Sequence, residues 1–332
     1  MGTLAYMASG TSELDAYGAV GRSEWMDIDW QDHLRWVRVM GRWMNIVELG
    51  PTKASESDDD RPPVIFIHGL SGCWQNWLEQ LPLFAREQRV IGVDLPGFGQ
   101  SEMPAEPISM SNYADAIDAL MTELDIDSAQ IVGNSMGGFI GAELAIQHAA
   151  RVERLVLVAA AGLSIESIRT ERTTGLRHRA ENVVFFSLGH LASQSAQVAL
   201  RRRLRHALLL LVAAHPAKLP GPLAAQQVLG SGKPGFSDAL EAMCRYPLRD
   251  RLEKIACPTL IVWGDKDILV PVKDADIFEE LIPDSRKIIY KDTGHVSMME
   301  RPARFNSDVK AFVDEAPGEE QPTEQQPRAV AS

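Results

Sequence analysis

The sequence has little cysteine, no secretion signal and no long apolar run. Cys73, Cys244 and Cys257 are scattered, without C-x-x-C spacing or nearby histidines, so neither a metal site nor a disulfide framework is indicated. The first 20 residues lack the basic start and apolar core of a signal peptide. The densest apolar stretch, residues 207–214, is far shorter than the roughly 20 residues of a membrane span. We therefore expect a cytoplasmic protein with no stable membrane insertion, no metal and no cofactor.

Positive charge is also scarce. The formal net charge is -12, whereas a protein that binds the nucleic-acid backbone needs a basic face to release phosphate counterions. Nucleic acid is therefore not an expected partner. Hydrophobic residues make up 45% and charged residues 23%, which is typical of a folded globular chain. With 332 residues, the chain is long enough for one large domain or for a domain with an inserted subdomain.

Short apolar runs alternate with longer amphipathic stretches. Stretches such as 111–124 and 136–149 have helical length and periodicity, and a hairpin that turns near Gly41 precedes the alternation. Unbroken apolar runs are typical of strands covered on both faces, so the fold class is α/β, with a mainly parallel central sheet and helices on both faces. The predicted buried strands are 64–67, 90–93, 130–132, 155–158, 260–263 and 287–290.

The predicted core is interrupted once and extended at both ends. Residues 31–161 and 251–316 form the core, and residues 162–250, which have helical pattern but no convincing strand, form a helical cap or lid after the sixth strand. Residues 1–30 are an N-terminal extension. Residues 317–332, rich in Pro, Glu and Gln, are predicted to be a disordered tail because they have too few apolar residues to offset ordering entropy.

The pentapeptide Gly-Asn-Ser-Met-Gly at 133–137 lies directly after a predicted strand and directly before a predicted helix. A serine in such a tight turn projects its hydroxyl into a cleft, and glycines on either side let neighbouring backbone approach. The Met136 N–H and the helix dipole would face a developing oxyanion. This placement disfavours a chance match in a glycine-rich turn, so Ser135 is the predicted nucleophile.

A second glycine-bounded loop follows the strand at 64–67. In His68-Gly-Leu-Ser-Gly, a backbone N–H at Leu70 could complete an oxyanion hole with the N–H of Met136. The alternative is a plain turn at the end of a strand. We interpret His68 as a hydrogen-bond partner that braces this loop rather than as a catalyst.

A serine nucleophile needs a base, and the base needs an orienting acid. His295 follows the last predicted strand, and both Asp265 and Asp267 follow the strand before it, with Asp274 as a third choice. The order serine, acid, histidine is that of G-x-S-x-G hydrolases, and all three positions fall at one edge of a parallel sheet. Each aspartate could instead be a solvated loop carboxylate. The other histidines considered lie in presumed helices, cap or hairpin: His33, His148, His178, His190, His206 and His215.

These motifs together resemble the α/β-hydrolase superfamily. The resemblance implies that the last residue of the G-x-x-D turn, Asp267, is the acid, and that Leu70 and Met136 form the oxyanion hole. It also implies a cap in the 162–250 region. The motifs, which lie within residues 36–313, are HGLSG (68–72), DLPGFGQS (94–101), GNSMGG (133–138), GDKD (264–267) and GHVSMMERP (294–302).

The resemblance also narrows the reaction. Related epoxide hydrolases and haloalkane dehalogenases use aspartate where Ser135 stands, so their chemistries are disfavoured. GNSMGG is similar to enzymes that hydrolyse carbon–carbon bonds in aromatic ring-fission products, but those tend to carry an HGSGPG-like loop and a tryptophan where Val296 stands. We expect a hydrolase of small to medium carboxylic esters acting through an acyl-enzyme. The alternatives are a carbon–carbon hydrolase, an acyltransferase, or an idle binding protein with the same fold.

The predicted cap is basic although the chain is acidic. Residues 161–250 contain twelve Arg or Lys against six Asp or Glu, and the arginines at 201–205 abut the apolar residues 208–212. The favoured interpretation is that arginines cover a solvent face and pair with the acidic body. The alternative is weak contact with an anionic lipid surface through this amphipathic segment. The expected partner is a small-molecule ester.

Overall fold

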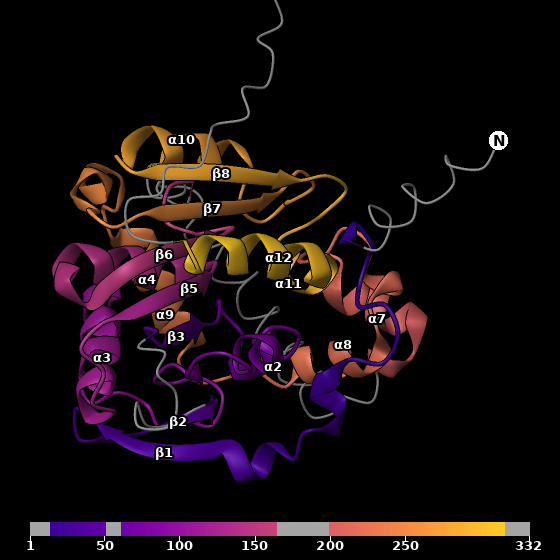
Figure 1. Ribbon diagram of the computed structural model, residues 1–332, viewed down its shortest axis with the longest axis horizontal. Coiled ribbons are helices and arrows are strands. Elements are labelled where there is room, and N and C mark those ends of the chain that lie inside the picture. The colour runs from indigo at the N-terminus through magenta and orange to yellow at the C-terminus, as the bar shows by residue number, and fades with distance from the viewer. Residues whose placement is uncertain (1–13, 51–60, 165–198, 316–332) are drawn as a thin grey trace, which may run out of the picture.

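The computed structural model describes residues 14–50, 61–164 and 199–315. Its centre is an eight-stranded sheet in the order β1-β2-β4-β3-β5-β6-β7-β8, which Figure 1 shows from β8 at the top to β1 at the bottom. The pairs β1–β2 and β2–β4 are antiparallel, and every later pair is parallel. The predicted α/β class with a mainly parallel sheet is confirmed.

The strands lie where the apolar runs predicted them. All residues of β3, β4, β5 and β7 are buried, as expected for strands covered on both faces, whereas the edge strand β8 is only partly buried. The hairpin turns at Met40 and Gly41, both with positive φ. The bounds are β1 Leu34–Val39, β2 Arg42–Leu49, β3 Val64–Ile67, β4 Val90–Val93, β5 Ala129–Asn134, β6 Val152–Val158, β7 Thr259–Gly264 and β8 Ser285–Tyr290.

Helices cover both faces of the sheet, as predicted. Buried side chains of α3 (Met110–Glu123), α4 (Met136–Gln147) and α10 (Lys273–Leu281) belong to the core on one face, and those of α2 (Leu81–Phe84) and α12 (Pro302–Val313) to the core on the other. The short helix α11 (Ser297–Glu300) precedes α12. The 3₁₀ helices are Glu24–Asp27, Trp30–His33, Trp74–Trp77, Ala149–Arg151, Pro216–Lys218 and Arg249–Lys254.

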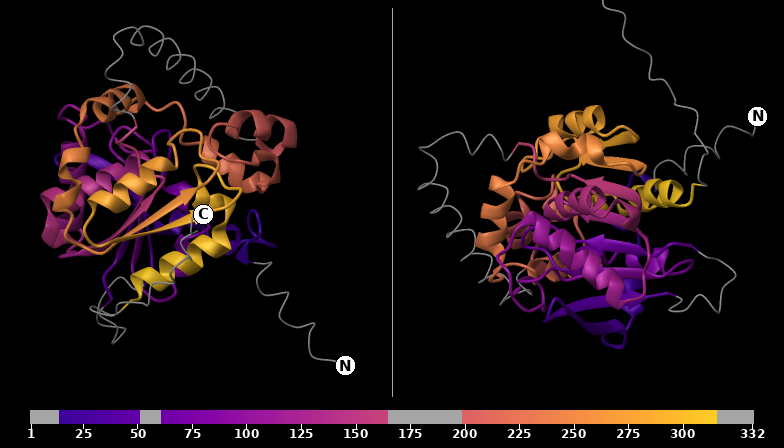
Figure 2. Two further views of the ribbon diagram at one scale, coloured as in Figure 1. Left: turned by 90° about the horizontal axis from the view of Figure 1, so that it is seen from above. Right: turned by 90° about the vertical axis from the view of Figure 1, so that its left-hand side faces the viewer.

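The chain between β6 and β7 is helical in its described part. It carries α7 (Arg202–Leu209), α8 (Gly221–Val228) and α9 (Phe236–Arg245), and Figure 2 shows α7 and α8 beside the sheet layers. Residues 165–198 of the predicted cap lie outside the described residues, as does the predicted tail at 317–332.

Part of the predicted N-terminal extension packs on the body. Trp25 is buried, and its indole N–H donates to the Glu79 carboxylate at 2.9 Å. The Trp30 ring lies 5.0 Å from the Trp74 ring, centre to centre. Across the described ranges, the helices lack the combination of length and hydropathy needed to cross a membrane.

Candidate active site

Ser135 occupies a strained turn between β5 and α4. Its φ of 55° and ψ of -115° lie in a region that non-glycine residues rarely adopt. Its N–H donates to the Val158 carbonyl at 2.9 Å, and its own carbonyl accepts from Phe139 at 3.1 Å and Ala161 at 3.0 Å. Because β6 and α4 both hold this residue, the strained conformation persists.

The flanking glycines are required by close backbone contacts. A Cβ at Gly133 would lie 2.2 Å from the Gly137 carbonyl oxygen, and one at Gly137 would lie 2.2 Å from the Ile67 carbonyl oxygen. Such distances are far shorter than van der Waals contact, so a side chain at Gly133 would clash with the start of α4 and one at Gly137 would push the turn away from β3. The G-x-S-x-G spacing thus brings the serine close to the end of β3.

His295 and Asp267 form a buried pair. The His295 Nδ1 atom lies 2.7 Å from Asp267 Oδ2, and the two side chains are 6% and 0% exposed. The other carboxylate oxygen accepts the N–H groups of Leu269 at 2.9 Å and Val270 at 3.0 Å. An ionised carboxylate only accepts hydrogen bonds, so Nδ1 carries the imidazole proton and Nε2 keeps a lone pair.

The other two candidate acids lie elsewhere. Asp265 is exposed, and its carboxylate accepts a long 3.4 Å bond from the Thr293 N–H. Asp274 is buried, but it accepts from the N–H and hydroxyl of Ser164 at 2.9 and 2.6 Å. Of the three aspartates that the sequence left open, the structure brings Asp267 to the histidine.

Asn134 joins the serine turn to the histidine loop. Its amide donates to the carbonyls of Val158 at 3.0 Å and His295 at 3.3 Å. Within the described ranges, no direct hydrogen bond joins the Ser135 hydroxyl to the imidazole. The side-chain amide of Asn134 therefore links the backbone of the serine turn to the backbone of the His295 loop.

The two predicted oxyanion donors flank the serine turn. Met136 is the first residue of α4, and Leu70 follows Gly69, where a Cβ would lie 3.1 Å from the Ser135 Cβ. In the part of the chain that the structure describes, neither the Leu70 nor the Met136 N–H donates to another protein group. Both amides are therefore available to an oxygen bound beside Ser135.

His68 braces the loop, as the sequence predicted. Its Nδ1 donates to the Gly69 carbonyl at 2.7 Å and its Nε2 accepts the Leu95 N–H at 3.0 Å. Complete burial lowers the pKa of His68, which keeps the ring neutral. Asp94, in the DLPGFGQS motif, braces the neighbouring loop by accepting the backbone N–H groups of Trp74 and Gln100, each at 2.9 Å.

Glu300 is a buried acid beside the site that sequence reasoning missed. Its carboxylate accepts the N–H of Gly294, the residue before His295, at 2.9 and 3.0 Å. Burial raises the pKa of Glu300. The position of Glu300 in the GHVSMMERP motif could have indicated a role near His295. A glutamate in a short helix is usually exposed, so nothing in the sequence indicated that Glu300 is buried.

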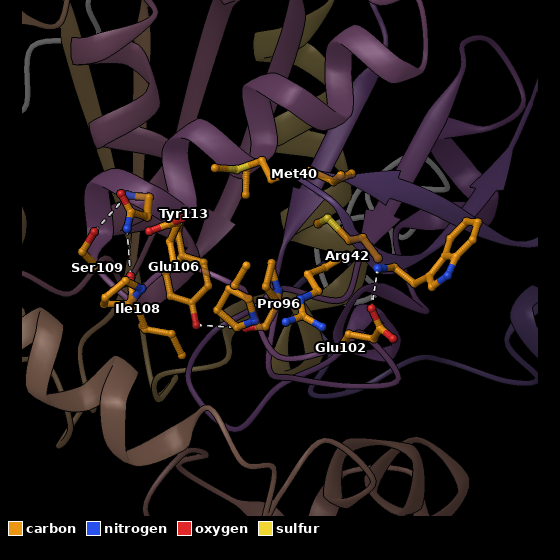
Figure 3. Close-up of a pocket in the computed structure, with 16 residues that line it drawn as sticks. Met40, Arg42, Pro96, Glu102, Glu106, Ile108, Ser109 and Tyr113 are labelled. Carbon is orange, nitrogen blue, oxygen red and sulfur yellow. Dashed lines mark hydrogen bonds between the residues drawn. The ribbon is translucent and has the colours of Figure 1, made fainter.

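A separate cavity lies between the β1–β2 hairpin and α3. Figure 3 shows Met40, Pro96 and Tyr113 among its lining residues, with the Tyr113 hydroxyl donating to the Pro96 carbonyl at 3.1 Å. Ser135, Asp267 and His295 are not part of its lining. The described residues contain no cluster of three or more His, Cys, Asp or Glu placed to hold a metal ion.

The chain belongs to the α/β-hydrolase family. The family model described as alpha/beta hydrolase fold matches residues 62–302. The family and fold expected from the motifs are thus confirmed, and the protein is a hydrolase by family.

Among its relatives is the 2-hydroxymuconate semialdehyde hydrolase of Pseudomonas sp. (strain CF600), 30% identical over 76% of this chain and 87% of that protein. A solved meta-cleavage product hydrolase, CumD, is 25% identical with a TM-score of 0.64, covering 85% of this chain and 98% of that one. An esterase from Exiguobacterium antarcticum has the same fold, with a TM-score of 0.66 at 22% identity over 84% of this chain and 99% of that one.

Proposed function

We propose that this protein hydrolyses carboxylic esters of small to medium acyl chains through an acyl-enzyme on Ser135. The observation that carries the proposal is the buried Asp267–His295 pair, 2.7 Å apart, tied through Asn134 to the strained serine turn. A strained turn at the nucleophile and a base held by an acid are features that acyl transfer by serine uses.

In the proposed reaction, the Ser135 oxygen attacks the ester carbonyl while His295 Nε2 takes the hydroxyl proton. Asp267 holds the imidazole and stabilises its positive charge. The N–H groups of Leu70 and Met136 donate to the tetrahedral oxyanion. Its collapse breaks the ester C–O bond, and the imidazolium gives its proton to the leaving alcohol. Water then repeats the steps and releases the acid and free Ser135.

The second candidate is carbon–carbon hydrolysis of an aromatic ring-fission product on the same residues. The observations that favour it are the relative and the solved structure named for such substrates, at 30% and 25% identity. Against it stand Val296 after the histidine and the HGLSG loop, where such enzymes tend to carry tryptophan and a glycine-rich loop. An acyltransferase would use the same acyl-enzyme with another acceptor than water.

The test combines active-site labelling with a substrate series. A fluorophosphonate should label Ser135 stoichiometrically, and p-nitrophenyl esters from acetate to octanoate should be hydrolysed faster than a ring-fission product. Ser135→Ala and His295→Ala should each reduce ester turnover by several orders of magnitude. An unlabelled Ser135, or faster turnover of the ring-fission product, would overturn the ester proposal.

A further inference from the structure

Three distant segments of the chain meet at the Glu300 carboxylate. Besides the N–H of Gly294, it accepts the N–H of Ala214, in the cap, at 2.9 Å and the hydroxyl of Tyr17, near the N-terminus, at 2.5 Å. The Glu300 side chain is fully buried. The residue therefore links the histidine loop, the cap and the N-terminal segment at one point.

The cap segment 212–215 is attached directly to the histidine loop. The Val212 carbonyl accepts the N–H groups of His295 at 3.0 Å and Val296 at 3.2 Å. The His215 N–H donates to the Tyr17 hydroxyl at 2.8 Å. The Tyr17 hydroxyl thus donates to Glu300 while it accepts from the cap, so removing one oxygen atom breaks both links.

The N-terminal segment 15–18 is held to the same place by its backbone. The Gly18 N–H donates to the Glu300 carbonyl at 2.8 Å, and the Arg301 guanidinium donates to the Asp15 carbonyl at 2.5 Å. The Tyr17 ring lies 5.3 Å from the His215 ring, centre to centre, and Figure 1 shows the indigo N-terminal segment on the same side of the molecule as α7 and α8. Burial raises the pKa of Tyr17, so its phenol stays protonated and can donate.

We infer that Tyr17 and Glu300 are positioning residues that set the place of His295 through the N-terminal and cap segments. The inference rests on the proposed function. Neither residue contacts the His295 imidazole: Glu300 accepts the Gly294 N–H just before it, and Tyr17 acts through Glu300 and through the His215 N–H of the 212–215 segment. Because a misplacement of about 1 Å can cost roughly a hundredfold in rate, loosening this backbone should slow the chemical step.

Glu79 provides a matched control. Glu79 is a partly buried carboxylate that also holds the N-terminal segment, accepting from the Ser23 hydroxyl at 2.8 Å and the Trp25 indole at 2.9 Å. Burial raises the pKa of Glu79 as it does that of Glu300. Its side-chain partners do not belong to the histidine loop, so losing them should weaken the same segment without moving His295.

The experiment compares Tyr17→Phe, Glu300→Gln and Glu79→Gln in the full chain. The rate constant for fluorophosphonate labelling of Ser135 should fall roughly tenfold to a hundredfold in the first two variants, with the labelled fraction still near one. The kcat for p-nitrophenyl acetate should fall with little change in KM. Glu79→Gln should label at the wild-type rate, whatever its Tm. Equal slowing in all three variants would make the effect merely structural and overturn the inference.

Amide hydrogen exchange separates failure of the inference from failure of the proposed function. Exchange in a peptide covering residues 294–299 should be faster in Tyr17→Phe than in wild type, and unchanged in Glu79→Gln. An unlabelled wild-type Ser135 would refute the proposed function alone. Unchanged exchange at 294–299 in a folded Tyr17→Phe variant would overturn the positioning role. Tyr17→Phe keeps the aromatic ring and removes only the hydroxyl, so it tests the positioning role even if Glu300→Gln does not fold.

Discussion

The loop that carries His295 and helix α7, in the predicted cap region, are held in different ways. The loop is held through its backbone by Val212, Asn134 and Glu300, and its imidazole is buried. Helix α7 buries Arg205 and Leu209 and leaves its other two leucines exposed. The exposed leucines on and beside it are Leu200, Leu204, Leu208, Leu210 and Leu211.

The difference shows that polarity alone does not decide which face of a segment is buried. Arg205, 7% exposed, donates to the carbonyls of Ala199 at 3.0 Å, Leu200 at 3.2 Å, Pro216 at 3.2 Å and Ala217 at 3.3 Å. No leucine could satisfy those carbonyls, because only a guanidinium offers so many donors. Helix α7 is therefore held by hydrogen bonds from one buried side chain to the backbone of other segments. The histidine loop is held by hydrogen bonds to its own backbone.

The largest expected effect is the loss of activity when the acid that holds His295 is replaced. Asp267→Asn should lower kcat for p-nitrophenyl acetate by about 10⁴-fold, because the amide no longer holds the imidazole in the right tautomer. Asp265→Asn, two residues away and exposed, is the matched control and should stay near wild type. Steady-state kinetics of the two variants checks this, and the reverse ranking would assign the orienting role to Asp265.

On the α7 side, the expected effect is on stability. Arg205→Met leaves backbone carbonyls without a donor, at a cost of roughly 1–3 kcal/mol, so Tm should fall by several degrees. Arg203→Met, on the exposed surface of the same helix, should leave Tm unchanged. Thermal unfolding followed by circular dichroism measures both. Equal Tm values would mean that Arg205 does not orient α7.

A pH series sharpens the comparison at the N-terminal segment. Burial raises the folded-state pKa of Glu79, so the folded state binds the proton more tightly than the unfolded state. Wild type should therefore lose stability as pH rises from the ordinary glutamate pKa through the raised one. Glu79→Gln mimics the protonated form and lacks this loss. The Tm of wild type relative to Glu79→Gln should fall as the pH rises above the ordinary glutamate pKa of about 4.3; a constant difference would contradict the raised pKa.

The smallest effect should be contact of α7 with anionic lipid. Leu204 and Leu208 are 40% and 37% exposed beside three exposed arginines at 201–203, and α7 contains no acid. Weak flotation with phosphatidylglycerol vesicles at low salt, and none with phosphatidylcholine, is expected. Leu204→Glu should reduce it, and Ile289→Glu on β8 should not. Protein that stays soluble with phosphatidylglycerol would exclude the contact.

The part of the candidate site that a short sequence pattern defines, the serine turn, was predictable from the sequence. The glycines at 133 and 137 indicate the serine turn because their contacts with neighbouring backbone leave no room for a Cβ. The choice between Asp265 and Asp267 was not predictable from the residues, since both lie in one loop. The choice depends on the folded conformation of the loop, which places the N–H groups of Leu269 and Val270 against the Asp267 carboxylate.

Glu300 and α7 show why other features of the structure could not be predicted from the sequence. The role of Glu300 depends on Tyr17 and Ala214, which lie 283 and 86 residues away along the chain. An amphipathic pattern in α7 cannot reveal that Arg205 is buried beside Leu209, because the carbonyls that the arginine satisfies belong to other segments, at Ala199 and Pro216.

By itself, the sequence determined the parallel α/β sheet, the serine turn and the chain order of nucleophile, acid and histidine. Apolar runs and glycine contacts act over a few residues, and strand ends meet at one edge of a parallel sheet. Only the tertiary structure decided that Asp267 is hydrogen-bonded to His295, that the N-terminal segment is hydrogen-bonded to Glu300, and which face α7 buries. Each of those outcomes depends on hydrogen bonds to backbone groups whose positions exist only after the chain has folded.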